Sequence, residues 1–153
     1  VAVKGKFFYS DGHKVYLKGV TYGTFKQQAD GNCFPDKETV ENDFALMVKH
    51  GINCIRTYTV PTPSFLDIAA QYGLRVMVGI PWEQHILFLD SAESRRRIID
   101  TVRQAVLTCG QHPAVLCFTI GNEVQCFVVM RRYSQKLQIV FNDGFAPGTG
   151  MQK

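Results

Sequence analysis

The chain alternates short apolar segments with longer amphipathic ones, and this alternation restricts its fold more than any other feature. Strands are predicted at residues 18–23, 52–60, 74–80 and 114–120, with helices between them at about 36–51, 62–73 and 91–109. Strands that alternate with crossover helices form parallel sheets. The sequence therefore predicts an α/β protein.

Local signals mark where these helices begin and end. Asp36 can cap the first helix, and Thr62 followed by Pro63 supplies a cap and an N1 proline for the second. Gly51 and Gly73 suit the left-handed position that follows a helix. In the third helix, the apolar spacing predicts an inner stripe made of Ile98, Ile99, Val102 and Val106.

A different pattern precedes the first of these strands. Residues 6–9 and 15–17 are β-like, and Ser10-Asp11-Gly12 between them is typical of a turn. We expect an N-terminal β-hairpin here, lying on one end of the main fold.

Polar residues at the strand ends distinguish the two folds that this alternation allows, a doubly wound sheet and part of a TIM barrel. No Gly-x-Gly-x-x-Gly loop follows the first strand, so the dinucleotide-binding form of the doubly wound sheet lacks its main feature. A TIM barrel places its active site at the carboxyl ends of its strands. The candidate site residues at those ends are Tyr22, Arg56, Tyr58, Trp82, Glu83, His85, Asn122 and Glu123. We therefore predict a partial (β/α)₈ barrel of about four β/α units.

Glu123 is the strongest candidate for catalysis. Hydrolysis of a glycosidic bond needs a carboxylic acid that protonates the leaving oxygen and a second carboxylate that attacks or activates water. Glu123 ends the fourth predicted strand beside Asn122, where it can act as that acid. The alternative is that Asn122 and Glu123 only cap the start of a helix.

Arg56 and Tyr58 form the second candidate pair. Arg56 lies in an otherwise apolar strand, and an always-charged side chain enclosed in a barrel needs an anionic partner such as a catalytic carboxylate. Tyr58 has the same strand parity, so the two side chains share a face. A surface arginine that faces outward is the alternative.

Three residues after the third strand are candidate substrate contacts. Trp82 can stack on the apolar face of a sugar ring, or it can fill space as a hydrophobic plug. Glu83 and His85 can form hydrogen bonds with a substrate, or they can simply be solvent-exposed loop residues at the rim of the site.

Composition narrows the class of partner. The five cysteines are widely spaced with no C-x-x-C pair, so neither a zinc site nor a disulfide framework is expected, and a reducing, cytoplasmic setting fits best. The net charge of +4 is dispersed except at residues 95–97, which fit a solvated helix face with acidic neighbours better than a nucleic-acid patch. No stretch is apolar enough to span a bilayer. The candidate residues at the strand ends favour a carbohydrate substrate. We expect no cofactor or metal, and neither nucleic-acid nor membrane partners.

In these residues the sequence resembles the (β/α)₈ catalytic barrel of glycoside hydrolase family 2 and related retaining glycosidases. The matching segments are 18–23 (KGVTYG), 51–58 (GINCIRTY), 72–80 (YGLRVMVGI), 81–85 (PWEQH) and 112–124 (HPAVLCFTIGNEV). The resemblance implies acid/base catalysis by Glu123, a sugar hydroxyl contact by Asn122 and a nucleophile-orienting role for Arg56. It also implies a nucleophilic glutamate at the end of a seventh strand, for which this sequence has no matching motif.

The resemblance divides the chain into two parts. Residues 1–124 are interpreted as the N-terminal half of a glycosidase-type barrel, and residues 125–153 as a divergent helix and loop tail with apolar residues at helical spacing between 130 and 141. A half barrel has open strand edges, so we expect either self-association or pairing with the missing C-terminal half. A retaining β-glycosidase that works by double displacement is the leading hypothesis. A glucan transglycosidase and a non-catalytic carbohydrate-binding or scaffold remnant are the alternatives.

Overall fold

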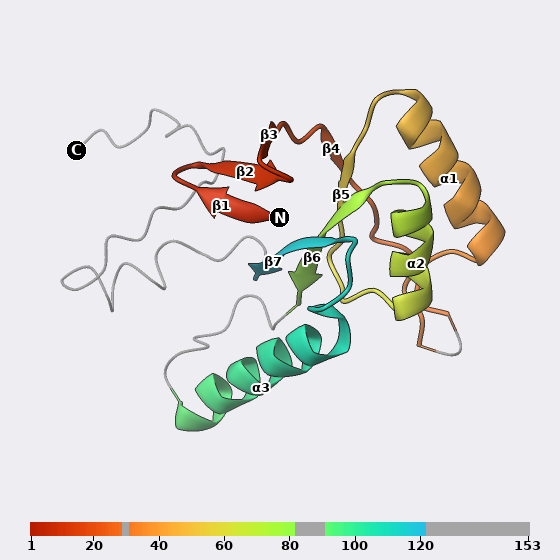
Figure 1. The fold of residues 1–153 in the computed structure, drawn as a ribbon. Coiled ribbons are helices and arrows are strands. Elements are labelled where there is room, and N and C mark those ends of the chain that lie inside the picture. The colour runs from red at the N-terminus through yellow and green to blue at the C-terminus, as the bar shows by residue number, and fades with distance from the viewer. Residues whose placement is uncertain (29–30, 82–90, 122–153) are drawn as a thin grey trace, which may run out of the picture.

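The computed structural model describes residues 1–28, 31–81 and 91–121, and its centre is a four-stranded parallel sheet (Figure 1). The strand order is β4 (Gly19–Thr21), β5 (Cys54–Arg56), β6 (Arg75–Ile80) and β7 (Val115–Ile120). Helices α1 (Lys37–Lys49), α2 (Pro63–Gln71) and α3 (Ala92–Cys109) connect successive strands. The predicted α/β architecture, in which each strand lies beside the next one along the chain, is confirmed.

A second, antiparallel sheet precedes it. Strands β1 (Ala2–Lys4), β2 (Phe7–Ser10) and β3 (His13–Val15) pair in sequence order. The predicted hairpin corresponds to β2 and β3, but the prediction missed β1. Three residues before Gly5 carry too short a pattern to be recognised, and β1 is defined only by its pairing with β2.

The side chain of Asn53 holds the segment that links the two sheets. Its Nδ2 donates to the carbonyl oxygen of Tyr16 at 2.8 Å, and its Oδ1 accepts from the backbone N–H of Lys18 at 2.8 Å. The backbone N–H of Asn53 also donates to the carbonyl of Lys18 at 3.0 Å. One residue before β5 therefore fixes the segment that leads from the antiparallel sheet into β4.

The predicted helix boundaries at α1 and α2 are confirmed. The Asp36 carboxylate accepts from the backbone N–H of Thr39 at 2.9 Å, and the Thr62 hydroxyl accepts from that of Phe65 at 3.3 Å. Both helices end in a Schellman motif, with Gly51 at φ +77° and Gly73 at φ +69°. Glycine adopts this left-handed conformation without steric cost, which turns the chain directly into β5 and β6.

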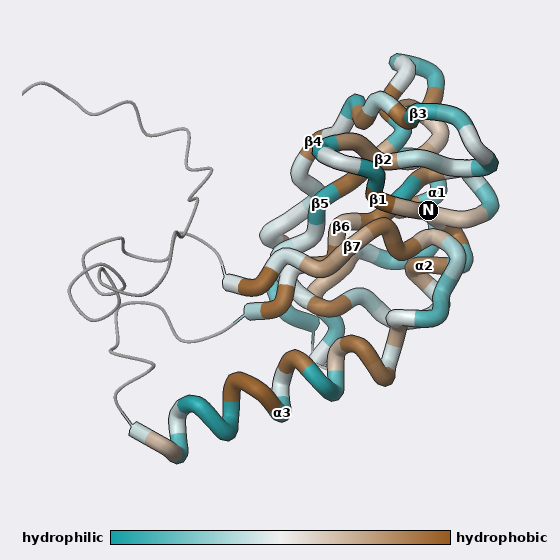
Figure 2. Tube along the Cα trace, turned by 60° about the vertical axis from the view of Figure 1, so that its left-hand side comes forward, coloured by the Kyte–Doolittle hydropathy of each residue, from teal (hydrophilic) through white to brown (hydrophobic). Residues whose placement is uncertain are grey.

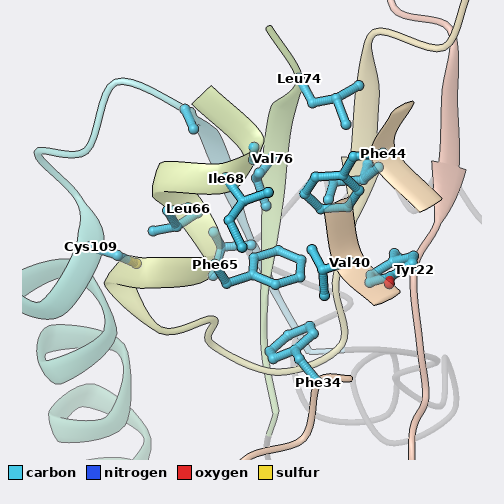
Figure 3. Packing of buried hydrophobic residues seen from close by; sticks show 14 residues of the cluster. Tyr22, Phe34, Val40, Phe44, Phe65, Leu66, Ile68, Leu74, Val76 and Cys109 are labelled. Carbon is cyan, nitrogen blue, oxygen red and sulfur yellow. The ribbon is translucent and has the colours of Figure 1, made fainter. Parts of the chain in front are cut away.

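The hydrophobic core lies between the parallel sheet and the pair α1 and α2 (Figure 3). Its centre is aromatic: the rings of Phe34 and Phe65 are 4.3 Å apart, and those of Phe44 and Phe65 are 5.3 Å apart. Aliphatic side chains from β5 and β6, including Ile55 and Val76, complete it. These strand residues alternate with residues on the other face of the sheet, which is the face that forms the site.

Helix α3 carries hydrophobic residues at intervals along its length (Figure 2), but it buries less of their surface than its sequence predicts. Of the predicted inner stripe, Ile98 and Val102 are half-buried, whereas Ile99 and Val106 are 56% and 43% exposed. The line that faces the sheet continues instead through Ala105 and Cys109, at the spacing of one helix face. Neither α3 nor any other helix in the described ranges is long and apolar enough to cross a membrane.

Candidate active site

The carboxyl ends of the four parallel strands meet at a pocket of about 500 Å³. Every strand contributes to its wall, through residues 23–24 after β4, 56–59 at the end of β5, 79–81 at the end of β6, and Thr119 and Gly121 at β7. This is the edge at which a TIM barrel carries its active site. The pocket therefore lies at the strand ends, and two of the predicted site residues, Arg56 and Tyr58, line it.

Arg56 and Tyr58 lie together in this pocket. The guanidinium carbon of Arg56 is 5.5 Å from the centroid of the Tyr58 ring, a distance that allows a cation–π interaction. Ile55, which precedes Arg56, is fully buried in the core on the opposite face. The strand parity thus predicts correctly that the two side chains share a face, and Arg56 gives the pocket a permanent positive charge.

Gly79 shapes the wall beside Tyr58. A Cβ atom at this position would overlap the carbonyl oxygen of Thr57 and lie 2.9 Å from the Cα of Tyr58. The backbone N–H of Gly79 also lies 3.4 Å from the Thr57 hydroxyl, which is fully buried. Because β6 has no side chain here, the end of β5 can cross close to it and present Tyr58 to the pocket. Sequence reasoning missed this role, although a glycine within an apolar strand is a signal of close backbone approach.

Tyr22 lies elsewhere than the sequence suggested. Its side chain is 5% exposed and packs with Phe44 and Phe65 in the core, on the helix side of the sheet (Figure 3). Its hydroxyl donates to Asp43 at 2.7 Å, and burial followed by this carboxylate raises its pKa. Side chains alternate along a strand, so the neighbouring Gly23 faces the pocket and Tyr22 faces the helices.

The pocket face of the sheet also holds two cysteines below the site. Cys54 begins β5 and is buried, and Cys117 on β7 is half-buried. Burial raises the pKa of the Cys54 thiol to about 11, and burial also raises that of Cys117. Both thiols therefore stay protonated at neutral pH and act as small apolar side chains.

Five predicted site residues, Trp82, Glu83, His85, Asn122 and Glu123, lie outside the described residues. Two described neighbours show where the chain leads into them. Pro81 directly precedes Trp82, Gly121 directly precedes Asn122, and both line the pocket. The backbone N–H of Gly121 donates to the carbonyl of Ile80 at 3.3 Å, which holds these two strand ends side by side.

The family model described as "Glycosyl hydrolases family 2, TIM barrel domain" matches residues 1–142 of the chain. The chain belongs to glycosyl hydrolase family 2. The four parallel strands with their three crossover helices are accordingly part of that family's TIM barrel, as the sequence predicts.

The chain is also similar to individual glycosidases. A β-galactosidase of Arthrobacter sp. (strain B7) is 28% identical in an alignment of 132 residues that covers 80% of this chain and 13% of the galactosidase. Among solved structures, a β-D-glucuronidase of Dictyoglomus thermophilum matches with a TM-score of 0.65 and 19% identity, over 88% of this chain and 25% of its own. A β-galacturonidase of Eisenbergiella tayi matches with a TM-score of 0.61 and 23% identity, over 86% of this chain and 24% of its own. The chain thus spans a quarter or less of these relatives, and the structural matches establish the fold alone.

Proposed function

We propose that this chain supplies the acid/base half of the active site of a retaining glycoside hydrolase that cleaves β-glycosides. A carboxylate attacks the anomeric carbon while Glu123 gives its proton to the departing oxygen, which breaks the glycosidic bond. Glu123 then takes a proton from the water that attacks the same carbon, and this step releases the sugar and frees the nucleophile. In this proposal the nucleophile comes from outside these 153 residues.

One observation carries the proposal: the pocket at the strand ends brings Arg56 and Tyr58 together with Gly121, which directly precedes Asn122 and Glu123. A guanidinium is the cation best suited to hold a carboxylate by two parallel hydrogen bonds. Arg56 would orient the nucleophile and keep it ionised, because a nearby positive charge lowers the pKa of a carboxyl group.

We assign the remaining candidates to substrate contacts, because they follow closely on Pro81 and Gly121 of the pocket wall. We assign Asn122 to a sugar hydroxyl and Trp82 to stacking on the apolar face of the sugar ring. Glu83 and His85, which follow Pro81 and Trp82, would hydrogen-bond to further hydroxyls. The Tyr58 hydroxyl and the hydroxyls of Thr24, Thr59 and Thr119 offer additional partners within the described wall.

The test uses a protein in which these residues lie within a complete eight-stranded barrel. Glu123→Ala should slow glycosylation far more for a substrate with a poor leaving group than for an activated aryl glycoside, which needs little protonation. Added azide should restore turnover of the activated substrate as a glycosyl azide, because azide needs no general base. Equal losses for both leaving groups, with no effect of azide, would show that Glu123 is not the acid/base.

Arg56 provides the second arm of this experiment. Arg56→Gln should lower kcat by about 10² to 10⁴ with little change in KM, since the side chain acts on the transition state rather than on binding. Arg75→Gln is the matched control, because Arg75 begins β6 at the end of the sheet opposite the pocket. Similar kcat losses in both variants would contradict the role of Arg56.

A further inference from the structure

One face of the N-terminal antiparallel sheet combines lysines with aromatic rings. Residues directly opposite each other in the sheet place their side chains on the same face, and the pairs Lys4 with Phe7 and Tyr9 with Lys14 do so here. Tyr16, two residues beyond Lys14, extends the row. We call this the lysine–aromatic face, and it consists of Lys4, Phe7, Tyr9, Lys14 and Tyr16.

The lysines of this face are held by the rings beside them. The Lys14 ammonium lies 3.1 Å from the centroid of the Phe7 ring and 5.0 Å from that of Tyr16. The Lys4 ammonium lies 5.3 Å from the centroid of the Tyr9 ring. A free lysine loses much rotamer freedom when it binds a ligand, and cation–π contacts reduce that loss by restricting the side chain beforehand.

The charge around this face is strongly one-sided. Residues 1–18 contain four lysines and a single acidic residue, Asp11, which lies in the turn between β2 and β3. Tyr16 is 68% exposed and Phe7 is 38% exposed, so the face is open among the described residues. Such a surface is complementary to a ligand with several negative charges.

We propose that the lysine–aromatic face binds an acidic polysaccharide, a sugar chain that carries carboxylate or sulfate groups. The anionic groups pair with the fixed ammonium groups of Lys4 and Lys14, and the sugar rings contact the exposed edge of Tyr16. Two other polyanions fit less well. A nucleobase needs a free ring face for stacking, and the face of Phe7 already carries an ammonium group. A bilayer needs apolar side chains that are free to insert beside the cations, whereas the Phe7 ring lies against the Lys14 ammonium and exposed Val3 has the opposite strand parity from Lys4.

This site is separate from the pocket of Arg56, because the face belongs to another sheet (Figure 1). The proposal therefore stands whether or not the pocket hydrolyses glycosides. Arg56→Gln should leave binding to the lysine–aromatic face unchanged, which separates a failure of one proposal from a failure of the other.

Titration calorimetry of the full chain with polygalacturonate at low ionic strength tests the proposal. The double variant K4Q/K14Q should weaken binding about tenfold or more. Added salt should also weaken the binding of polygalacturonate to the native chain. Phe7→Leu, which keeps an apolar side chain but removes the ring under Lys14, should weaken binding about threefold. Neutral dextran should not bind.

The control K49Q/R96Q removes the same charge from two exposed helix positions, Lys49 on α1 and Arg96 on α3. It should change the affinity less than about twofold if the location of the charges matters. Equal weakening by both double variants would reduce the effect to net charge and overturn the proposal. Tighter binding of a single-stranded oligonucleotide than of polygalacturonate, or no binding of polygalacturonate, would overturn it as well.

Discussion

Helices α2 and α3 occupy equivalent places in successive β/α units, yet they are held very differently. Helix α2 has nine residues and buries Phe65, Leu66, Ile68 and Ala69. Helix α3 is twice as long at 18 residues and buries only Ala105 and Cys109. Small residues allow α3 to approach the sheet closely, but they remove little apolar surface from water. An amphipathic pattern therefore predicts that a helix forms and says less about how firmly it is packed.

A pair of identical substitutions gives the sharpest test of this comparison. Leu66 of α2 is fully buried and Leu107 of α3 is 71% exposed. Leu66→Ala should lower the free energy of unfolding by about 2 to 5 kcal/mol, because it removes buried methyl groups and leaves a cavity. Leu107→Ala should change it by about 0.5 kcal/mol or less. Urea denaturation followed by circular dichroism measures both, and similar losses would remove the distinction between the two helices.

The helix caps provide a test of intermediate size. The Thr62 hydroxyl caps α2, and the Ser91 hydroxyl caps α3 by accepting from the backbone N–H of Ser94 at 2.9 Å. Thr62→Ala should lower the free energy of unfolding of the chain by about 1 kcal/mol. Ser91→Ala should have less effect on global unfolding, because a weakly held helix can open locally. Hydrogen exchange should show that opening in the first turn of α3. A larger global loss from Ser91→Ala would contradict the comparison.

The smallest expected effect is a pH dependence on the α1 side. Hydrogen bonds from the backbone and then the side chain of Thr39 lower the pKa of Asp36 below 3.8. Because the folded pKa is the lower one, the stabilisation is fully present above about pH 3.8 and is lost as the pH falls through the folded value. Asp36→Asn keeps a good capping group that does not titrate. The stability of this variant should therefore fall less than that of the native chain when the pH drops below about 3.8. Ser91 does not titrate, so the cap of α3 should not respond to this change of pH. If the stability of Asp36→Asn fell on acidification as much as that of the native chain, this role of Asp36 would be contradicted.

The parts of the fold that the sequence predicts well have local causes. Asp36, Thr62, Gly51 and Gly73 mark helix ends through contacts within a few residues, and each of these boundaries agrees with the structure. The pocket pair Arg56 and Tyr58 follows from strand parity, which is equally local. The polar residues at the strand ends and then the resemblance to the family favoured the barrel, since four β/α units by themselves allow more than one closed or open sheet.

The parts that the sequence does not predict depend on distant contacts. Strand β1 exists only through its pairing with β2. The burial of α3 depends on which of two adjacent rows of apolar residues on the helix faces the sheet. Tyr22 was assigned to the site by its place at a strand end, but a shift of one residue moves a side chain from one face of a sheet to the other. Gly79 acts through a chain segment more than twenty residues away, so its position alone does not reveal what it accommodates.

The double hydrogen bond of Asn53 has a consequence for the order in which the chain folds. The antiparallel sheet needs only the first fifteen residues, and its contacts are local enough to form early. Its attachment to the barrel spans 35 and 37 residues and cannot exist until Asn53 is in place. During synthesis from the N-terminus, these two hydrogen bonds can therefore form only after α1 and the start of β5 have emerged, so the link between the sheets is completed late.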